Sequence, residues 1–390
     1  MRRFAGLATA AVLTTALAVE PIVDGCTAFL ASGEDGVLFG NNEDFWNPAT
    51  KMWFVTAAEG GYGAMFFGFD NLSPQGGMNE AGLAFDGFAT RPKPVTETAE
   101  KESFNGNLVL KVMTECATIA EVLKVYQGYD LARMERFMLM FADATGDSVI
   151  IEGDEFIRKS GGFQVVTNFY QSEDPTGKNA YGEGKACSRF EVANRMLGRT
   201  KRVNISDARE VLDAVHIEGE SNTLYSNIYD LDDRLVYVYN FHDFDNEVVI
   251  DLSEELKKGP HVVDLPSLFP RNSARETFVA KQEQAMELRR QNRGLVDLPI
   301  DALERFAGTY RSSFGDLEIK VDYGALVVAA FGQSPLRLTP FSETGFFETT
   351  LMMDYEITFH IGDGGEVTGA DVRIFRDDFT MAEQFIERIK

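Results

Sequence analysis

The order of the apolar periodicities along the chain is the feature that most constrains its fold. After Cys26, short strand-like runs separated by Gly, Asn and Asp turns come first, beginning with a hairpin pattern that turns at 33–36. Helical spacing follows in three segments, 108–127, 188–200 and 206–216. In the last of these, Ser206 is the expected N-cap. A final series of strands runs from 223 to 252. Strands, then helices, then strands again predict an α+β layered domain rather than a doubly wound parallel sheet.

The sequence changes in texture near Leu295. From there to the end of the chain, short alternating strands are separated by Gly and Asp turns. This pattern predicts a small all-β domain, built as a curled sheet or a barrel. A charged helical segment at 271–294 precedes it. We therefore expect a large domain over 26–270, a helical linker over 271–294 and a small β domain over 295–390.

The first residues have the pattern of a secretory signal peptide. Arg2 and Arg3 are followed by an apolar run and by the small-x-small sequence that ends at Ala18. The alternatives are a buried N-terminal helix, or a lipid anchor on Cys26, which Asp24 disfavours. We predict a signal peptide over 1–18, a short propeptide over 19–25, and an exported protein in the periplasm or outside the cell.

Composition limits the partners that we expect. The formal net charge is −24, which disfavours nucleic acid and anionic membrane surfaces as partners. Hydrophobic residues make up 44% of the chain, enough for a globular core. The apolar run of the leader is too short for a convincing membrane anchor, so we expect no membrane insertion. We expect a small-molecule acyl-amide substrate, and the sequence leaves open whether the protein forms a homo-oligomer.

The few cysteines and histidines give no support for a disulfide framework or a metal site. The three cysteines are Cys26, Cys116 and Cys187, whereas an exported protein that relied on disulfides would usually have more, in an even number. Cys116 lies in a helical pattern and is expected to pack. The four histidines are scattered, without the spacing of zinc ligands. We therefore predict no cofactor and no metal.

Cys26 has a base available within its own residue. If cleavage occurs between Gly25 and Cys26, Cys26 becomes N-terminal, and its α-amino group has an ordinary pKa of about 7.7–8. Such an amine can act as a general base toward the adjacent thiol at neutral pH. Gly25 lacks a side chain and would let the thiol approach the preceding carbonyl for self-cleavage. This predicts an N-terminal cysteine nucleophile.

Five segments in series carry a resemblance to a known family. They are CTAFLASGEDGVLFGNNEDF from Cys26, GGMNEAGLAFDGF, ADATGDSVIIE, VVTN and SRF. Together they resemble the choloylglycine hydrolases, or linear amide C–N hydrolases, which include bile salt hydrolases and penicillin V acylases. The resemblance covers Cys26 to about Leu252 and implies a four-layer αββα N-terminal-nucleophile hydrolase sandwich. The β domain after 295 lies outside it.

The resemblance implies roles for four residues. Cys26 is the expected nucleophile, and Asp44 matches the aspartate that hydrogen-bonds the region of its amine. Asn168 matches the asparagine that donates to the oxyanion, and Arg189 matches the arginine that organises the site. Taken singly, Asp44 could be a turn residue, Asn168 a strand-end cap and Arg189 the partner in an ion pair at the start of a helix.

Two positions depart from the family pattern. Asn41 stands where the family usually has an arginine, and Ala89 stands where its second asparagine would fall. The second oxyanion donor would then come from the backbone, from Asn79 or from Asn222, or be absent. These departures question the familiar substrates of the family more than its chemistry.

We expect Asn41 and Ala89 to face the substrate, together with aromatic side chains. Phe66 and Phe88 are the aromatic residues that we expect in an apolar acyl pocket, whereas most of the other aromatic residues are expected in the core.

These features predict an exported amidase that cleaves a linear amide, in an N-acyl amine or N-acyl amino acid, through an acyl-thioester on Cys26. A related cysteine-nucleophile dipeptidase is the alternative, because its opening also ends in Asn-Glu-Asp. An inactive binding relative is a third possibility, given the departures at Asn41 and Ala89.

Overall fold

The computed structural model describes residues 25–390, except for gaps at 35, 96–100, 103, 105–106, 178–184, 200–203, 292, 313–314, 330–335, 351–352 and 377–378. The predicted signal peptide and residues 19–24 of the predicted propeptide lie outside the described residues. Gly25, the last residue of that propeptide, is described and buried.

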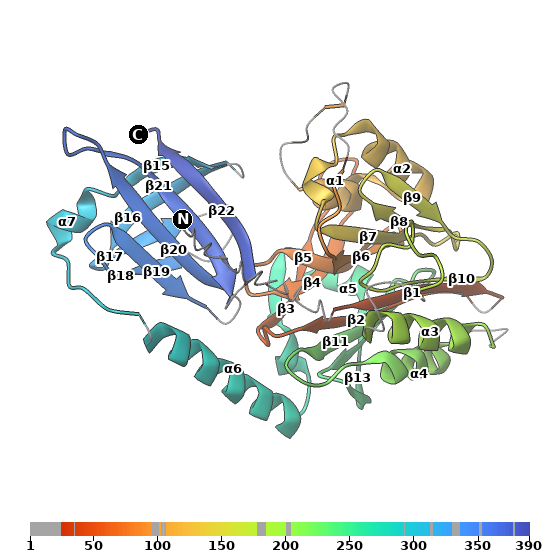
Figure 1. Ribbon diagram of the computed structural model, residues 1–390. Helices are drawn as coiled ribbons and strands as arrows, with labels where there is room; N and C mark the ends of the chain where they lie inside the picture. Colours follow the sequence, from red (N-terminus) through yellow and green to blue (C-terminus); the bar gives the residue numbers. More distant parts are fainter. Residues whose placement is uncertain are drawn as a thin grey trace, which may run out of the picture.

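Two antiparallel sheets form the larger part of the molecule (Figure 1). Sheet A has the strand order β10-β1-β2-β11-β12-β13, and sheet B has the order β14-β3-β4-β5-β6-β7-β8-β9. The strands are β1 (Thr27–Gly33), β2 (Gly36–Phe45), β3 (Thr50–Val55), β4 (Ala64–Phe69), β5 (Pro74–Asn79), β6 (Ala84–Ala89), β7 (Phe137–Ala142), β8 (Ser148–Glu152), β9 (Glu155–Arg158), β10 (Phe163–Val166), β11 (Asn222–Asp230), β12 (Leu235–Asn240), β13 (Asp243–Asp251) and β14 (His261–Asp264).

Helices cover the outer faces of both sheets. α3 (Lys185–Leu197) and α4 (Ile205–Val215) pack on sheet A, and α1 (Leu108–Glu115) and α2 (Ile119–Gly128) pack on sheet B, each over its own apolar cluster. A third cluster fills the space between the sheets, where Phe67 and Met140 of sheet B meet Tyr225 of sheet A. The result is a four-layer αββα sandwich, which confirms the predicted fold class. Three short helices complete this part: η1 (Ala132–Met134), α5 (Leu252–Leu256) and η2 (Leu265–Leu268).

The last part of the chain is a closed barrel with its own core, as the alternating pattern predicted. Its strands follow one another in sequence order and enclose an apolar cluster that includes Phe306, Phe346 and Phe359. The elements are α7 (Ile300–Glu304), β15 (Gly308–Ser312), β16 (Gly315–Asp322), β17 (Ala325–Ala329), β18 (Leu336–Pro340), β19 (Gly345–Thr349), β20 (Asp354–Ile361), β21 (Val367–Arg376) and β22 (Phe379–Arg388).

Helix α6 (Ser273–Gln291) contacts both the sandwich and the barrel. Phe278 belongs to the cluster between the sheets and packs against Phe241, with ring centroids 5.4 Å apart. At the other end of the helix, Arg289 Nε donates to Asp354 Oδ1 at 3.2 Å. The predicted linker is therefore a docked helix, anchored at each end.

Two local expectations are wrong in detail. The helix expected over 108–127 is interrupted, because Cys116 has an extended backbone and Thr118 starts a new helix in a capping box with Glu121. The N-cap of α4 is Asn204 rather than Ser206, and its side chain accepts from the backbone N–H of Asp207. Within the described part of the chain, no helix is both long and apolar enough to cross a membrane.

Candidate active site

The Cys26 thiol lies in a row of polar side chains that crosses sheet A on the face toward sheet B. Pairing of Thr27 with Asn42 places Cys26 beside Glu43, and Tyr225 of β11 pairs with Glu43 from the other side. The thiol contacts the Glu43 carboxyl and the backbone N–H of Asp44, and Cys26 is buried. The nucleophile predicted from the sequence therefore sits at the start of the central strands, inside the sandwich.

A buried ion pair lies next to this row. Arg189 of α3 donates from Nη1 to Asp44 Oδ2 at 2.6 Å, and the same nitrogen donates to Thr27 Oγ1 at 3.2 Å. Its other terminal nitrogen donates to Asn168 Oδ1 at 3.2 Å. Thr223 of β11 donates from Oγ1 to the second oxygen of Asp44. The structure thus brings the predicted residues Asp44, Asn168 and Arg189 together beside the residue that follows Cys26.

Asn168 lies against the peptide bond that precedes Cys26. Its Nδ2 donates to the backbone carbonyl of Ala89 at 3.0 Å, and an amide nitrogen carries a second hydrogen. A β-carbon added to Gly25 would lie 2.4 Å from this same nitrogen. A side chain at residue 25 would therefore collide with the Asn168 amide, which lies close to the Gly25 backbone.

The surroundings of Cys26 are acidic. Burial raises the pKa of its thiol well above the ordinary value, and the negative charges of Glu43, Asp86 and Asp44 raise it further. Burial also raises the pKa of Glu43 to about 8, with Asp44 adding to the shift, and raises that of Asp86 in β6. The thiol is therefore protonated at neutral pH in the uncleaved chain, so its reaction requires a base.

Several buried polar atoms around Cys26 have no hydrogen-bond partner. They are Glu43 Oε2, both carboxyl oxygens of Asp86, both amide atoms of Asn41 and Oδ1 of Asn227. Asn41 and Glu43 lie two positions apart in β2, on the face that Val37 and Phe39 present to sheet B. Gly76 makes room for this arrangement, because a β-carbon there would lie 2.8 Å from Asp86 Oδ2.

The structure places only some of the residues expected to bind substrate near Cys26. Phe88 belongs to the cluster between the sheets that also contains Cys26. Ala89 follows it and is exposed, with its carbonyl bound to Asn168. Phe66, in contrast, faces α1 and α2 on the outer side of sheet B, because residues alternate between faces along β4. The structure does not bring Phe66 to the site, so we no longer assign it to an acyl pocket.

Neither asparagine suggested as a second oxyanion donor is placed for that role. The Nδ2 of Asn79 donates to the carbonyls of Met113 and Cys116, at 2.9 and 2.8 Å, which fixes α1 to β5. The amide of Asn222 donates to the Gly219 carbonyl at 3.0 Å. Asn168, whose Nδ2 lies close to the Gly25 backbone, is the amide that matches the oxyanion donor expected from the sequence.

Cys116 is buried in the cluster between sheet B and its helices, as its helical pattern predicted. None of the three cysteines is joined to another in a disulfide bond. Residues that the sequence did not single out are Glu43, Asp86, Thr223 and Tyr225. One signal was available for Glu43: alternation along β2 places it on the core-facing side, where an acidic residue is unexpected.

A cavity of about 300 Å³ lies on the α3 and α4 side of sheet A, where Arg189, His216 and Glu218 line it. The Cys26 thiol faces the opposite side of the sheet, toward sheet B. We therefore do not assign this cavity to the acyl group of a substrate.

One family model matches the chain over most of the sandwich. Residues 31–243 match the family described as acyl-coenzyme A:6-aminopenicillanic acid acyl-transferase. The matched segment covers more than half of the 390 residues and begins shortly after Cys26. The chain therefore belongs to this family.

Two solved structures are also similar to the chain. Penicillin V acylase from Agrobacterium tumefaciens is 20% identical, with a TM-score of 0.47, over 62% of this chain and 92% of that one. A mutant of conjugated bile acid hydrolase from Clostridium perfringens is 17% identical, with a TM-score of 0.49, over 64% of this chain and 97% of that one. A search of curated protein sequences gives no match.

The raised pKa of Glu43 predicts how stability depends on pH. The folded chain keeps the Glu43 proton up to about pH 8, whereas the unfolded chain releases it near its ordinary pKa of 4.5. The folded state thus binds more protons between these values, and the free energy of unfolding should fall as pH rises through this window. In a Cys26→Ala background, where the thiol cannot cleave the chain, Glu43→Gln should reduce this pH-dependent loss of unfolding free energy by roughly 2–4 kcal/mol.

Urea unfolding at pH 5 and pH 8 measures this difference. Glu283→Gln, on the exposed face of α6, is the matched control and should leave the pH dependence as it is in the parent. An equal pH dependence in the Glu43→Gln variant and its parent would show that Glu43 is ionised in the folded chain.

Proposed function

We propose that this protein is an exported amidase that hydrolyses a linear amide C–N bond in an N-acyl amine or N-acyl amino acid. The reaction passes through an acyl-thioester on Cys26, after autocatalytic cleavage has removed the residues up to Gly25. The arrangement that carries the proposal is the buried network of Asp44, Asn168 and Arg189 beside Cys26.

The chemistry follows from this arrangement. The freed α-amine of Cys26 takes the thiol proton while sulfur attacks the substrate carbonyl, and Asn168 Nδ2 donates to the oxygen that becomes negative. The resulting ammonium returns its proton to the departing amine, so the C–N bond breaks and an acyl-thioester remains. The amine then activates a water molecule, which releases the acid and restores the thiol.

Asp44 has the position to support the amine during these steps. It lies beside Cys26, and its negative charge favours the protonated form of a nearby amine. Arg189 keeps the Asp44 carboxylate in one orientation and also holds the Asn168 carbonyl oxygen, so that the Asn168 amide nitrogen points away from the guanidinium. One arginine therefore positions both the partner of the base and the oxyanion donor.

Self-cleavage would use the same oxyanion donor. The Gly25–Cys26 peptide bond lies against Asn168, as the 2.4 Å approach to a β-carbon at Gly25 indicates. The α-amine is still an amide at this stage and cannot act as a base. The Glu43 carboxyl contacts the thiol, and its carboxylate form is the group in position to accept the thiol proton.

The buried carboxyl groups favour a second candidate, a hydrolase for substrates whose acyl part carries an amine, such as dipeptides. Glu43 and Asp86 lie near the thiol with carboxyl oxygens that have no hydrogen-bond partner. A substrate ammonium close to the scissile carbonyl would supply partners for these oxygens. An apolar acyl group would leave them unpaired.

Removal of the oxyanion donor tests the leading proposal. Asn168→Ala should lower kcat by about a hundred- to a thousandfold with little change in KM, because the donor acts where charge develops in the transition state. Asn79→Ala is the matched control, since it also deletes a buried amide that binds backbone carbonyls, but on the far side of sheet B. It should lower Tm and leave the kcat of the folded enzyme unchanged. A rise in KM alone for Asn168→Ala would contradict the assigned role.

Asp44→Asn tests the base. Loss of the negative charge lowers the pKa of the nearby amine, so the acidic limb of the pH–rate profile should move to lower pH. The variant also leaves Arg189 without its carboxylate partner, so its Tm must be measured at each pH to count only folded enzyme. An unmoved limb in folded enzyme would contradict an amine base held by Asp44.

A pair of matched substrates separates the two candidates. An α-aminoacyl anilide and the same compound with an acetylated amine should be compared in the wild type and in Glu43→Gln. If the acyl part must carry an ammonium, kcat/KM for the free amine should exceed that for the acetylated form, and Glu43→Gln should lower only the former. A preference for the acetylated compound that is unaffected by Glu43→Gln supports the N-acyl amidase instead.

A further inference from the structure

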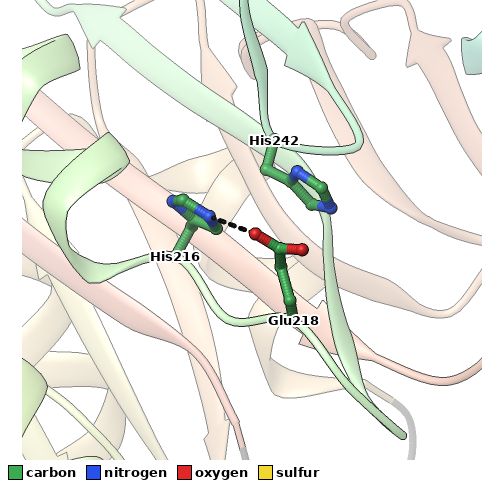
Figure 2. A group of neighbouring side chains, drawn as sticks. All are labelled: His216, Glu218 and His242. Atoms are coloured by element: carbon green, nitrogen blue, oxygen red, sulfur yellow. Dashed lines mark hydrogen bonds and ion pairs between the residues drawn. The ribbon is translucent and has the colours of Figure 1, made fainter. Parts of the chain in front are cut away.

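A second group of side chains able to bind a ligand lies at the end of α4, on the helix-covered side of sheet A. His216 is the residue that ends α4, Glu218 follows it, and His242 lies in the turn between β12 and β13 (Figure 2). One ligand atom from each of the three lies within 4.8 Å of the others. We propose that His216, Glu218 and His242 bind a divalent transition-metal ion. Two imidazole nitrogens and one carboxylate oxygen suit zinc(II) best.

The contacts of His216 leave a place for a cation. Its Nδ1 donates to the backbone carbonyl of Asp213, so Nε2 of the neutral ring carries a lone pair. That nitrogen lies 3.3 Å from Oε1 of Glu218, which also offers only lone pairs. Two such atoms repel each other unless a positive charge joins them, either a second proton on the ring or a metal ion. A backbone carbonyl behind Nδ1 is also the usual support of a metal-binding histidine.

His242 gives an independent observation. Its Nε2 is buried and has no hydrogen-bond partner, which is unfavourable for a polar group in a folded protein. The ring lies nearly parallel to that of His216, with centroids 5.1 Å apart and an angle of 13° between the planes. In Figure 2 the Glu218 carboxylate lies between the two rings. A metal ion there would supply the missing partner of His242.

The turn that carries His242 is held in an unusual conformation. Phe241 and His242 both have left-handed backbone angles, with φ of 53° and 48°. Two-residue hairpin turns of this kind usually contain Asn-Gly or Asp-Gly, because other side chains are strained there. Phe241 is buried in the cluster between the sheets, which fixes the turn and the direction of the neighbouring ring.

The distances suit a zinc ion after a small closure. Zinc binds nitrogen and oxygen at about 2.0–2.2 Å, so two ligand atoms of a tetrahedral site lie about 3.3–3.5 Å apart. Separations of up to 4.8 Å require side-chain shifts of about 1 Å. A water molecule would complete the tetrahedron, and the Asp213 carboxylate, 3.3 Å from Nδ1 of His216, adds favourable negative charge.

The site is connected to Asp44 through one threonine. Ile217, which lies between two of the ligands, donates from its backbone N–H to Thr223 Oγ1 at 2.9 Å and accepts from the Thr223 N–H at 3.0 Å. Thr223 Oγ1 in turn donates to Asp44. A metal ion that fixes the segment around Ile217 would therefore also fix the side chain that orients Asp44. His216 and Glu218 are positioning residues in this respect, since neither contacts Cys26.

Calorimetric titration of the full chain with zinc chloride tests the site. For this titration the protein should carry no polyhistidine tag and should first be freed of metal with a chelator. The wild type should bind a single equivalent, and His216→Ala and His242→Ala should each weaken binding by at least about tenfold. His360→Ala is the matched control, because His360 pairs with Asp371 at 2.7 Å on the exposed surface of the barrel, without a third ligand in the described group. It should bind zinc as the wild type does.

Two further readouts keep the test independent of catalysis. Zinc should raise the Tm of the wild type and of Cys26→Ala, but not that of His242→Ala. Cobalt(II) should give the visible absorption of a four-coordinate site in the wild type only. The proposal would be overturned if folded wild-type protein did not bind zinc, or if both histidine variants bound zinc as tightly as the wild type. A proton would then be the charge between His216 and Glu218. The amidase proposal is unaffected by either result.

Discussion

The buried ion pair between Arg189 and Asp44 is the interaction on which the rest of the site depends. The two side chains are 5% and 0% exposed and lie 2.6 Å apart. Such a pair contributes little net stability, but loss of one partner leaves an uncompensated charge and typically costs about 3–5 kcal/mol. The same guanidinium binds Thr27 and Asn168, so one side chain of α3 fixes the start of β1, the end of β2 and the loop after β10 relative to Cys26. The main contribution of this ion pair is therefore to position the segments around Cys26, rather than to stabilise the fold.

The charge balance around Cys26 explains why an amine is a suitable base. Three carboxyl groups, Asp44, Glu43 and Asp86, act on the thiol, and Arg189 pairs with only the first. Burial and these carboxyl groups oppose a thiolate in the resting enzyme, and a cation near the sulfur would favour ionisation of both the thiol and Glu43. An α-amine that becomes an ammonium during attack is such a cation. The family that the sequence resembles usually has an arginine at the position of Asn41. Asparagine there removes a positive charge from the strand face that carries Glu43, which keeps the surroundings of Cys26 acidic.

The sequence predicted the architecture, and it also named four residues that the structure places close together, for physical reasons. Strand and helix periodicities depend on local spacing, so the layered sandwich and the β barrel could be predicted from them. Cys26, Asp44, Asn168 and Arg189 were found through motifs in series. Asp86 and Thr223 could not be found, because they reach the site only through pairing of distant strands. Phe66 was misplaced because its face depends on the register of β4, which an apolar run without alternation does not show. The break near Cys116 was missed because apolar spacing continues through it.

The central claim is that Cys26 is an N-terminal residue that carries the acyl group. Mass analysis of the N-terminal peptide tests it most directly, using purified enzyme quenched with acid during turnover of an acyl-amide substrate. The account predicts a peptide that begins at Cys26, a fraction of which carries the added mass of the acyl group. A fully active chain that begins at Val19, or an acyl group found on Cys116 or Cys187 instead, would contradict it.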